Sequence, residues 1–153
     1  MQNISLGKWI SILYRYGHIF INKELEPHNI GKGQVLFLIA LYHKDGLPQE
    51  ELSLSLNIDK GTTARAIRKL ETTGYIIRKQ NTKDLRSHQI FLTEKAKAFE
   101  PHLFTILNRW TEILSEGMTE EEVETALRLL TKMASNAAGY IQKERSLFSE
   151  TTK

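Results

Sequence analysis

Residues 57–99 read NIDKGTTARAIRKLETTGYIIRKQNTKDLRSHQIFLTEKAKAF, and the spacing of their hydrophobic side chains changes at Gly74. Before Gly74 the apolar side chains recur every three or four positions, as on one face of a helix. After it, YIIRKQ and SHQIFL are rich in β-branched and aromatic residues, which is typical of strands, and the polar segment NTKDLR separates them. We therefore predict a helix over 60–72 and then a β-hairpin, with Asp59 capping the helix and Gly74 ending it.

A shorter helix, PQEELSLSL, is predicted immediately upstream. Pro48 suits its first turn, because the N–H that proline lacks would have no helical partner there. The side chains expected to face the core are Leu52, Leu54 and Leu56. Asn57 and Ile58 then form the turn to the next helix. Two short helices around a tight turn, followed by a β-hairpin, constitute a winged helix-turn-helix.

Two helices are predicted before this unit. The first covers residues 5–25, is ended by Pro27 and carries hydrophobic side chains on nearly every side, which implies burial against more than one neighbour. The second covers residues 32–43 and is stopped by Gly46.

Two longer helices are predicted after the hairpin. One begins at Thr93, is bent near Pro101 and ends at Gly117. Thr119 and Glu122 have the spacing of a capping box, which starts the last helix. The apolar stripe of that helix comprises Val123, Leu127, Leu130, Ala134, Ala137 and Ile141. Together with the apolar first helix, this stripe exceeds what one small subunit can cover, so we expect a dimer.

Basic side chains concentrate in the middle of the chain. Residues 59–92 carry eight Lys or Arg against three Asp or Glu, a net charge of +5, whereas the whole chain has +3. The remainder is therefore slightly acidic. This distribution is expected when one module faces phosphates and the rest does not, although a solvated basic helix face is the alternative explanation.

The predicted helix over 60–72 has two different faces. Its packed face comprises Thr63, Ala66, Ile67 and Leu70, and its opposite face comprises Lys60, Thr62, Ala64, Arg65, Arg68 and Lys69. A helix fits the major groove of DNA, where Arg can donate bidentately to guanine and short Thr side chains can approach base edges or phosphates. An ordinary amphipathic helix is the alternative. The basic hairpin that follows favours DNA binding, because it supplies a second DNA-facing element.

The segment over 57–99 resembles the DNA-binding part of the MarR family of bacterial and archaeal regulators. The resemblance lies in DKGT at the helix start, LETTGY at its end, DLR in the hairpin and LTEKA at the next helix. It extends over nearly the whole chain, since the family also has N-terminal helices and two C-terminal helices that interlock with a second subunit. The implied fold is mainly α with a small β-hairpin wing, a winged helix-turn-helix plus a helical dimerisation region.

This resemblance implies a transcriptional repressor that binds a pseudo-palindromic operator in double-stranded DNA as a homodimer. Residues 1–30 and 100–145 are expected to form the helical dimerisation region, and residues 31–99 the DNA-binding lobe. Residues 146–153 are expected to form a flexible tail.

The resemblance also implies roles for individual residues. Arg86 is expected to reach into the minor groove, and Asp84 to brace the wing or the recognition helix. The complete set of candidate DNA-binding residues is Lys60, Thr62, Thr63, Arg65, Arg68, Lys69, Lys83, Asp84 and Arg86. Gly61 and Leu85 stand where relatives often have Ser and Arg, so one hydroxyl contact and one wing charge are missing.

An effector site is a further hypothesis. Relatives bind phenolic or lipophilic anions between the dimerisation region and the DNA-binding lobe, and an effector is expected to weaken operator binding. The candidate residues are Trp9, Arg15, Tyr16 and Phe37. Arg15 lies in an otherwise apolar helix, so a ligand carboxylate could satisfy its charge, as could Glu24 or Glu26. Packing in the core or dimer is the alternative role for the aromatic residues.

Other functional classes find little support. The chain has no cysteine, which excludes thiol chemistry, and its five histidines lack a metal-ligand spacing. We expect no cofactor, no metal and no enzymatic activity, because neither a Gly-rich cofactor loop nor a paired-carboxylate arrangement is present. With neither a signal peptide nor an apolar span, a cytoplasmic location is expected. A non-specific architectural DNA binder and a winged-helix fragment of an enzyme are the rival interpretations.

Overall fold

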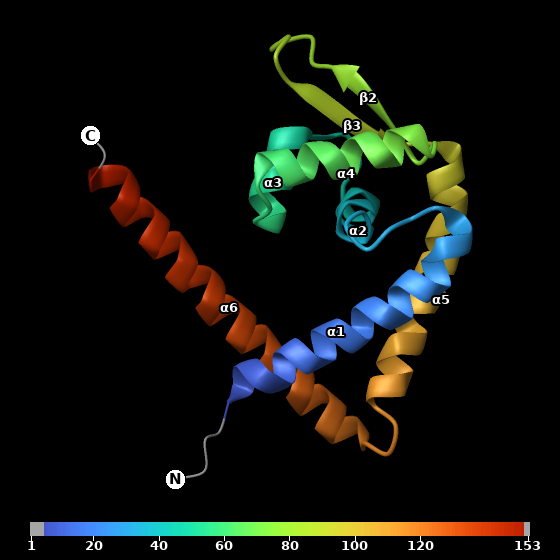
Figure 1. The fold of residues 1–153 in the computed structure, drawn as a ribbon, viewed down its shortest axis with the longest axis vertical. Helices are drawn as coiled ribbons and strands as arrows, with labels where there is room; N and C mark the ends of the chain where they lie inside the picture. Colours follow the sequence, from blue (N-terminus) through green and yellow to red (C-terminus); the bar gives the residue numbers. More distant parts are fainter. Residues whose placement is uncertain (1–4, 152–153) are drawn as a thin grey trace. The chain divides into compact units, whose positions relative to one another are not determined.

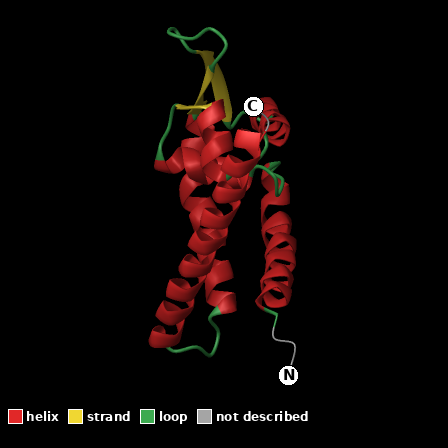
Figure 2. Cartoon of the chain, turned by 90° about the vertical axis from the view of Figure 1, so that its left-hand side faces the viewer, coloured by secondary structure: helices red, strands yellow, loops and turns green. Residues whose placement is uncertain are grey.

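A computed structural model describes residues 5–151 of the chain. Its helices and strands (Figures 1 and 2) are α1 (Leu6–Leu25), the 3-10 helix η1 (Glu26–His28), α2 (Val35–His43), β1 (Leu47–Pro48), α3 (Gln49–Leu56), α4 (Lys60–Thr72), β2 (Ile76–Gln80), β3 (His88–Leu92), α5 (Glu94–Leu114) and α6 (Glu120–Thr151). The chain divides into two compact units, one ending at Thr111 and one beginning at Glu112. The prediction of a mainly α fold with a β-hairpin wing is confirmed.

The helix-turn-helix forms where the sequence predicts it. Asn57 ends α3 in the left-handed conformation, with φ 53°, and the Ser53 hydroxyl donates to the Ile58 carbonyl at 2.6 Å. Leu52 is buried, but Leu54 is 75% exposed, so its predicted place in the core is wrong. The reason is helical geometry: side chains two positions apart point to nearly opposite sides of a helix, and Ser53 is buried instead.

The wing belongs to a three-stranded antiparallel sheet in the order β1-β3-β2. β2 pairs with β3 from Ile76 opposite Leu92 to Gln80 opposite His88. β1, which the sequence did not predict, pairs Leu47 with Ile90. Gly74 precedes the sheet with φ +84°, as its predicted role in ending α4 requires.

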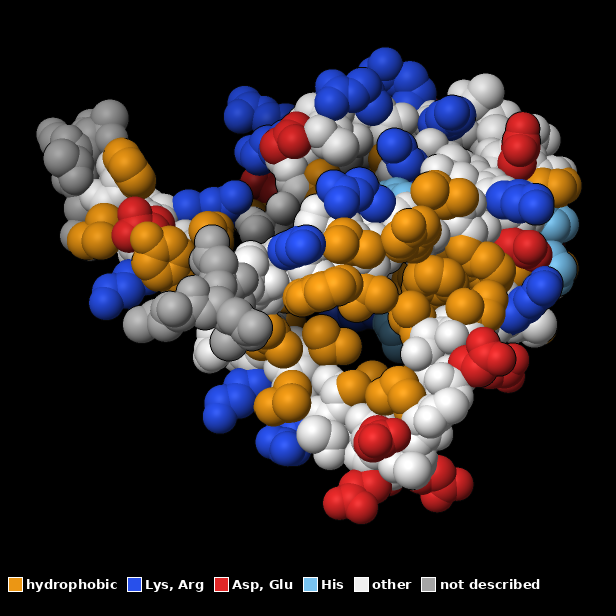
Figure 3. Space-filling model, turned by 60° about the horizontal axis from the view of Figure 1, so that its bottom comes forward, with side chains coloured by type: hydrophobic (Ala, Val, Ile, Leu, Met, Phe, Trp, Pro, Cys, Tyr) orange, Lys and Arg blue, Asp and Glu red, His pale blue; other side chains and the backbone are white. Residues whose placement is uncertain are grey.

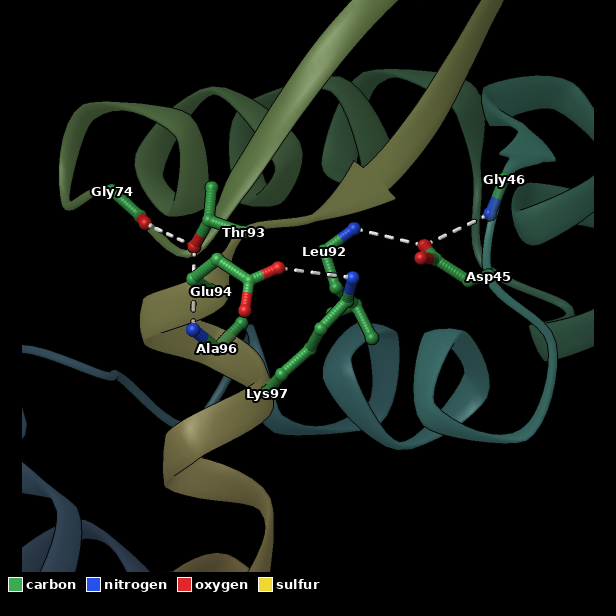
Figure 4. A network of polar contacts seen from close by, with 8 residues as sticks. All are labelled: Asp45, Gly46, Gly74, Leu92, Thr93, Glu94, Ala96 and Lys97. Atoms are coloured by element: carbon green, nitrogen blue, oxygen red, sulfur yellow. Dashed lines mark hydrogen bonds and ion pairs between the residues drawn. The ribbon is translucent and has the colours of Figure 1, made fainter.

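Two short polar networks join the sheet to neighbouring helices (Figure 4). The Asp45 carboxylate accepts the N–H of Leu92 at 2.8 Å and that of Gly46 at 2.9 Å, which ties the α2–β1 connection to β3. The Thr93 hydroxyl donates to the Gly74 carbonyl at 2.6 Å and accepts the N–H of Ala96 at 3.2 Å. Thr93 therefore links the end of α4 to the first turn of α5.

Replacing Asp45 by Ala is expected to lower the free energy of unfolding by about 1–3 kcal/mol, because the N–H of the buried Leu92 loses its acceptor. Asp45→Asn is the matched control, since its amide oxygen can still accept these N–H groups. Urea unfolding of the three proteins measures the difference. Equal stability of wild type and Asp45→Ala would show that this link contributes nothing.

The hydrophobic core of the first unit lies beneath α4 and the sheet. Its largest fully buried side chains include Phe37, Leu25, Leu38, Leu41, Leu52, Ile67, Leu70, Ile76, Ile90 and Leu103. Two tyrosine hydroxyls at the edge of this core donate to backbone carbonyls. Tyr75 donates to the His28 carbonyl and Tyr42 to the Ala96 carbonyl, each at 2.6 Å. Burial raises the pKa of both hydroxyls, with Glu100 adding to the rise at Tyr42.

α1 and α2 differ from their predicted forms. α1 begins at Leu6 with Ser5 as its N-cap, close to the expected start. Trp9 and Tyr16 on α1 are each 62% exposed on the single chain, so burial against more than one neighbour is not reached within one chain. α2 begins at Val35 rather than at Lys32, since Gly31 donates its N–H to the buried Gln34 side chain at 2.8 Å and holds a turn before the helix.

The second unit consists mainly of α6. The predicted capping box is confirmed: Thr119 donates its N–H to the Glu122 carboxylate at 2.8 Å, and Glu122 donates its N–H to the Thr119 hydroxyl at 3.1 Å. Of the side chains described in α6, none is buried. The expected tail after Arg145 is instead helical as far as Thr151, while residues 152–153 lie outside the described part. Among the described helices, none has the length and apolar character needed to span a membrane.

Candidate nucleic-acid interface

α4 presents its predicted basic face to solvent. Its exposed or half-buried candidates are Lys60, Thr62, Arg65, Arg68 and Lys69. The opposite face is fixed by Ala66, Ile67 and Leu70, which are buried in the core. Thr63 is also fully buried, so its inclusion among the DNA-contacting residues is wrong: its position on the packed face removes the hydroxyl from solvent. The helix can thus enter a groove without disturbing the core.

Three side chains at the start of α4 form a hydrogen-bonded chain. Asp59 caps the helix by accepting the N–H of Thr62 at 2.8 Å, and its other oxygen accepts the Thr62 hydroxyl at 2.7 Å. The Thr62 oxygen in turn accepts an N–H of the Arg65 guanidinium at 3.0 Å. The hydrogen bonds from Thr62 lower the pKa of Asp59, so the capping carboxylate keeps its charge to a lower pH than a free Asp side chain does.

The wing loop is held by its own polar groups. Asp84 accepts the N–H of Arg86 with its carboxylate and the N–H of Ser87 with its carbonyl, both at 3.0 Å. The Gln80 side chain donates to the Leu85 carbonyl at 2.6 Å. Asp84 therefore braces the wing turn itself, and the exposed Arg86 side chain lies near the end of the wing loop, just before β3. The sequence did not predict the contribution of Gln80.

Arg78 on β2 pairs with Glu71 on α4. The guanidinium donates twice to the carboxylate, at 3.1 and 3.0 Å, and joins the recognition helix to the wing. Hydrogen bonding by Arg78 holds the pKa of Glu71 below its ordinary value. This ion pair was not predicted, because a separation of seven residues across Gly74 matches no local pairing pattern.

The Glu71–Arg78 pair predicts a pH-dependent contribution to stability. A carboxyl whose pKa is lower in the folded state stabilises above its unfolded pKa, and the effect disappears as the pH falls below about 4. Glu71→Gln is expected to cost only about 0.2–1 kcal/mol at neutral pH, because both side chains are about one third exposed. Chemical unfolding at pH 7 and pH 3 tests this. A difference that grows on acidification would contradict the assignment.

A hollow of about 410 Å³ lies between α3, the start of α4 and the wing. Lys60, Arg78 and Arg86 line it together with Glu50 and Asp84. Lys60 lies 3.5 Å from the Glu50 carboxylate, but both side chains are well exposed, so this ion pair is weak. The structure thus brings Lys60, Asp84 and Arg86, which are far apart in the sequence, to one surface.

The four candidate effector residues do not line one site within the chain. Trp9, Arg15 and Tyr16 are exposed on α1, whereas Phe37 is fully buried in the core, so its role as a ligand contact is wrong. The ion pair considered for Arg15 is not formed with Glu24, which lies 3.9 Å from Arg109 instead. In the described part of the chain, no cluster of three or more His, Cys, Asp or Glu residues could hold a metal ion.

Comparison with known proteins identifies the family. The model of the MarR family matches residues 30–88. The HTH-type transcriptional regulator YybA of Bacillus subtilis, described as uncharacterized, is 35% identical over 115 residues, which cover 75% of this chain and 77% of YybA. The regulator BilQ of Clostridium symbiosum is 28% identical, with 80% and 85% of the two chains covered.

Solved structures agree with this assignment. A MarR transcriptional regulator from Methanosarcina mazei Go1 has 47% sequence identity and a TM-score of 0.85, with 88% of this chain and 97% of that chain covered. A putative MarR family regulator from Listeria monocytogenes, complexed with a 26mer DNA, has 30% identity and a TM-score of 0.83, with 92% and 95% covered. The helix-turn-helix, the wing and these similarities show that the chain belongs to the MarR family of transcriptional regulators.

Proposed function

We propose that this regulator binds a pseudo-palindromic operator in double-stranded DNA as a homodimer and represses the adjacent genes. The observation that carries the proposal is the joint exposure of basic side chains on α4 and the wing, with Lys60 and Arg86 lining the same hollow. The similar Listeria monocytogenes regulator was solved with DNA. The proposed DNA contacts are Lys60, Thr62, Arg65, Arg68, Lys69, Lys83 and Arg86, with Asp84 as the brace of the wing.

Exposed apolar side chains support the homodimer. On α6, Leu127, Leu130 and Ile141 are 40–58% exposed and repeat at intervals that suit packing of helix against helix. On α1, Trp9 and Tyr16 are uncovered as well. Figure 3 shows many hydrophobic side chains open on the face it draws. Because exposed apolar patches of this kind mark interfaces, we assign residues 1–30 and 100–145 to dimerisation and residues 31–99 to DNA binding.

Repression follows from the geometry proposed for the complex. Two recognition helices related by a two-fold axis enter successive major grooves about 34 Å apart, so the dimer covers a continuous stretch of duplex. A dimer bound across a promoter excludes other proteins from it. The proposal involves no catalytic step, in keeping with relatives that are named as transcriptional regulators.

Footprinting distinguishes this regulator from an architectural DNA-binding protein. A regulator is expected to protect one short symmetric site on the DNA upstream of its own gene, at concentrations that leave the flanks open. Uniform protection that spreads along the fragment as protein is added would support architectural binding and overturn the proposal. A reporter gene placed behind the protected site gives the sign of control, and lower expression in the presence of the protein is expected.

Arg86→Ala tests the wing contact. Losing one phosphate-neutralising charge from each subunit is expected to flatten the slope of log affinity against log salt by about 0.9 per contact, or about 1.8 for a dimer. Sensitivity to A·T content beside the half-sites should also fall, because Arg reads the narrow minor groove. Leu85→Ala, which removes no charge from the same loop, is the control. If affinity, slope and flanking preference all stay unchanged in Arg86→Ala, the wing does not contact DNA.

The proposed effector is an aromatic carboxylate or similar lipophilic anion that binds near Trp9, Arg15 and Tyr16 and weakens operator binding. Arg15 is exposed on the single chain, so the cost of an unpaired buried charge arises only where a second subunit covers α1. Calorimetric titration of a panel of aromatic acids against the dimeric wild type and Arg15→Ala tests the proposal. Affinities that do not differ between the two proteins would exclude Arg15 from the site.

A further inference from the structure

Hydrogen-bond directions at the start of α4 are fixed by chemistry. A carboxylate can only accept, so the Thr62 hydroxyl donates its single hydrogen to Asp59 at 2.7 Å. A guanidinium can only donate, so the same Thr62 oxygen accepts from Arg65 at 3.0 Å. The Thr62 hydroxyl therefore has no hydrogen left for a DNA phosphate unless its bond to Asp59 breaks.

The conformation of Arg65 depends on this chain of contacts. Arg65 is exposed, and a long exposed side chain without a partner samples many rotamers and must be ordered when it binds a base. Thr62 holds one guanidinium nitrogen over the first helical turn and leaves the other N–H groups of Arg65 free for the two-pronged donation that guanine accepts.

Gly61 provides the space that this arrangement needs. A side-chain carbon at position 61 would lie 3.3 Å from the Asp59 carboxylate and 3.5 Å from a guanidinium nitrogen of Arg65. The first distance is tighter than ordinary contacts between such atoms, so a methyl group at position 61 would require the capping carboxylate to shift by a few tenths of an ångström. Gly61, at a position where relatives often have Ser, thus lies beside Asp59 and Arg65, the two ends of the hydrogen-bonded chain.

The Asp59 carboxylate is expected to make a phosphate a less favourable partner for Arg65 than a base edge. It lies at the end of the same chain and partly offsets the guanidinium charge, while repelling the phosphate backbone. The uncharged edge of a base remains an acceptable partner. Arg68, further along the exposed face, takes no part in this hydrogen-bonded chain.

We propose that Thr62 acts as a positioning residue for base recognition: with Asp59 it orients Arg65 toward one base pair in each half-site and does not itself contact DNA. This inference rests on the proposed function, since it assigns the source of sequence selectivity within the same surface. It replaces the direct DNA contact assigned to the Thr62 hydroxyl above.

The test uses the full-length protein and two kinds of synthetic duplex. One carries the operator that the wild-type protein selects from random sequences, and the other carries a single-base variant of that operator. Thr62→Val keeps the side-chain shape but has no hydroxyl, whereas Thr62→Ser keeps the hydroxyl. Thr62→Val is expected to lower the discrimination between the operator and its single-base variant by about three- to tenfold, at the base pair that Arg65→Ala also affects. This loss is only part of the discrimination that a bidentate Arg–guanine pair supplies. Thr62→Ser should retain the wild-type discrimination. The slope of log affinity against log salt should be the same for Thr62→Val and wild type, because no charge is lost.

A double-mutant cycle completes the test. Adding Thr62→Val to Arg65→Ala is expected to cause no further loss, because the positioned side chain is already absent. An additive loss, or an equal loss on all sequences, would show a direct contact by Thr62 and overturn the inference. So would unchanged discrimination in Thr62→Val. A wild-type protein that prefers no sequence would instead overturn the proposed function, which separates the two failures.

Discussion

A chain that ends at Met118, without α6, is expected to be monomeric or aggregated and to lose operator binding. None of the described α6 side chains is buried within the chain, and Leu127 is 58% exposed. If these side chains pack against a second subunit, their removal eliminates the interface, and each remaining lobe holds only one half-site. The loss of the second half-site reduces affinity by orders of magnitude, because the lobes then bind independently. Analytical ultracentrifugation and fluorescence anisotropy measure both effects.

Substitutions in the full-length chain separate dimerisation from folding. Leu127→Glu combined with Leu130→Glu places two carboxylates on the proposed interface and should dissociate the dimer, whereas Arg128→Glu on the intervening position should leave it intact. Helical circular dichroism should persist in each variant, since the first unit has its own core. A soluble monomeric truncation that binds the operator with wild-type affinity would contradict the dimer model.

Arg65→Ala is expected to reduce operator affinity by about 1–3 kcal/mol per half-site, which for both half-sites amounts to about 2–6 kcal/mol. The preference for one base pair in each half-site should be lost, while preferences elsewhere in the operator persist. The physical reason is the position of Arg65 on the exposed face near the start of α4, where recognition helices meet base edges.

The matched control is Lys97→Ala, which removes an equal charge from α5, where Lys97 pairs with Glu94 outside the proposed surface. Binding to the operator and to each single-base variant is measured for both proteins at one salt concentration. If Arg65→Ala weakened binding to every duplex by the same factor, Arg65 would contact only phosphates. Unchanged binding would remove it from the interface altogether.

Local signals in the sequence predicted most of the elements. Asp59 caps α4, Gly74 takes a positive φ, and Thr119 and Glu122 form their capping box, because each of these features depends on residues a few positions apart. Features that depend on tertiary contacts were missed. β1 is too short to have a periodicity and exists because Leu47 pairs with Ile90.

The errors in the candidate site also have physical causes. The spacing of α4 already predicts Thr63 on the packed face, where it is buried, so its size and polarity alone did not justify including it among the DNA contacts. Phe37 is a plausible ligand contact by composition, but α2 lies in the centre of the core and buries it. The roles of Arg65 and Arg86 toward DNA remain predictions, whereas the Asp59–Thr62–Arg65 chain could be recognised only from side-chain geometry.

We infer that α4 and the wing of two subunits together read one symmetric DNA site. Sequencing the duplexes that the purified full-length protein selects from a random pool tests it most directly. We expect one enriched pseudo-palindrome whose half-sites are centred about one helical turn, or about 34 Å, apart. Arg65→Ala is expected to select a motif that is degenerate at one position per half-site. Selection of no common motif, or of a single asymmetric element without a second half-site, would contradict it.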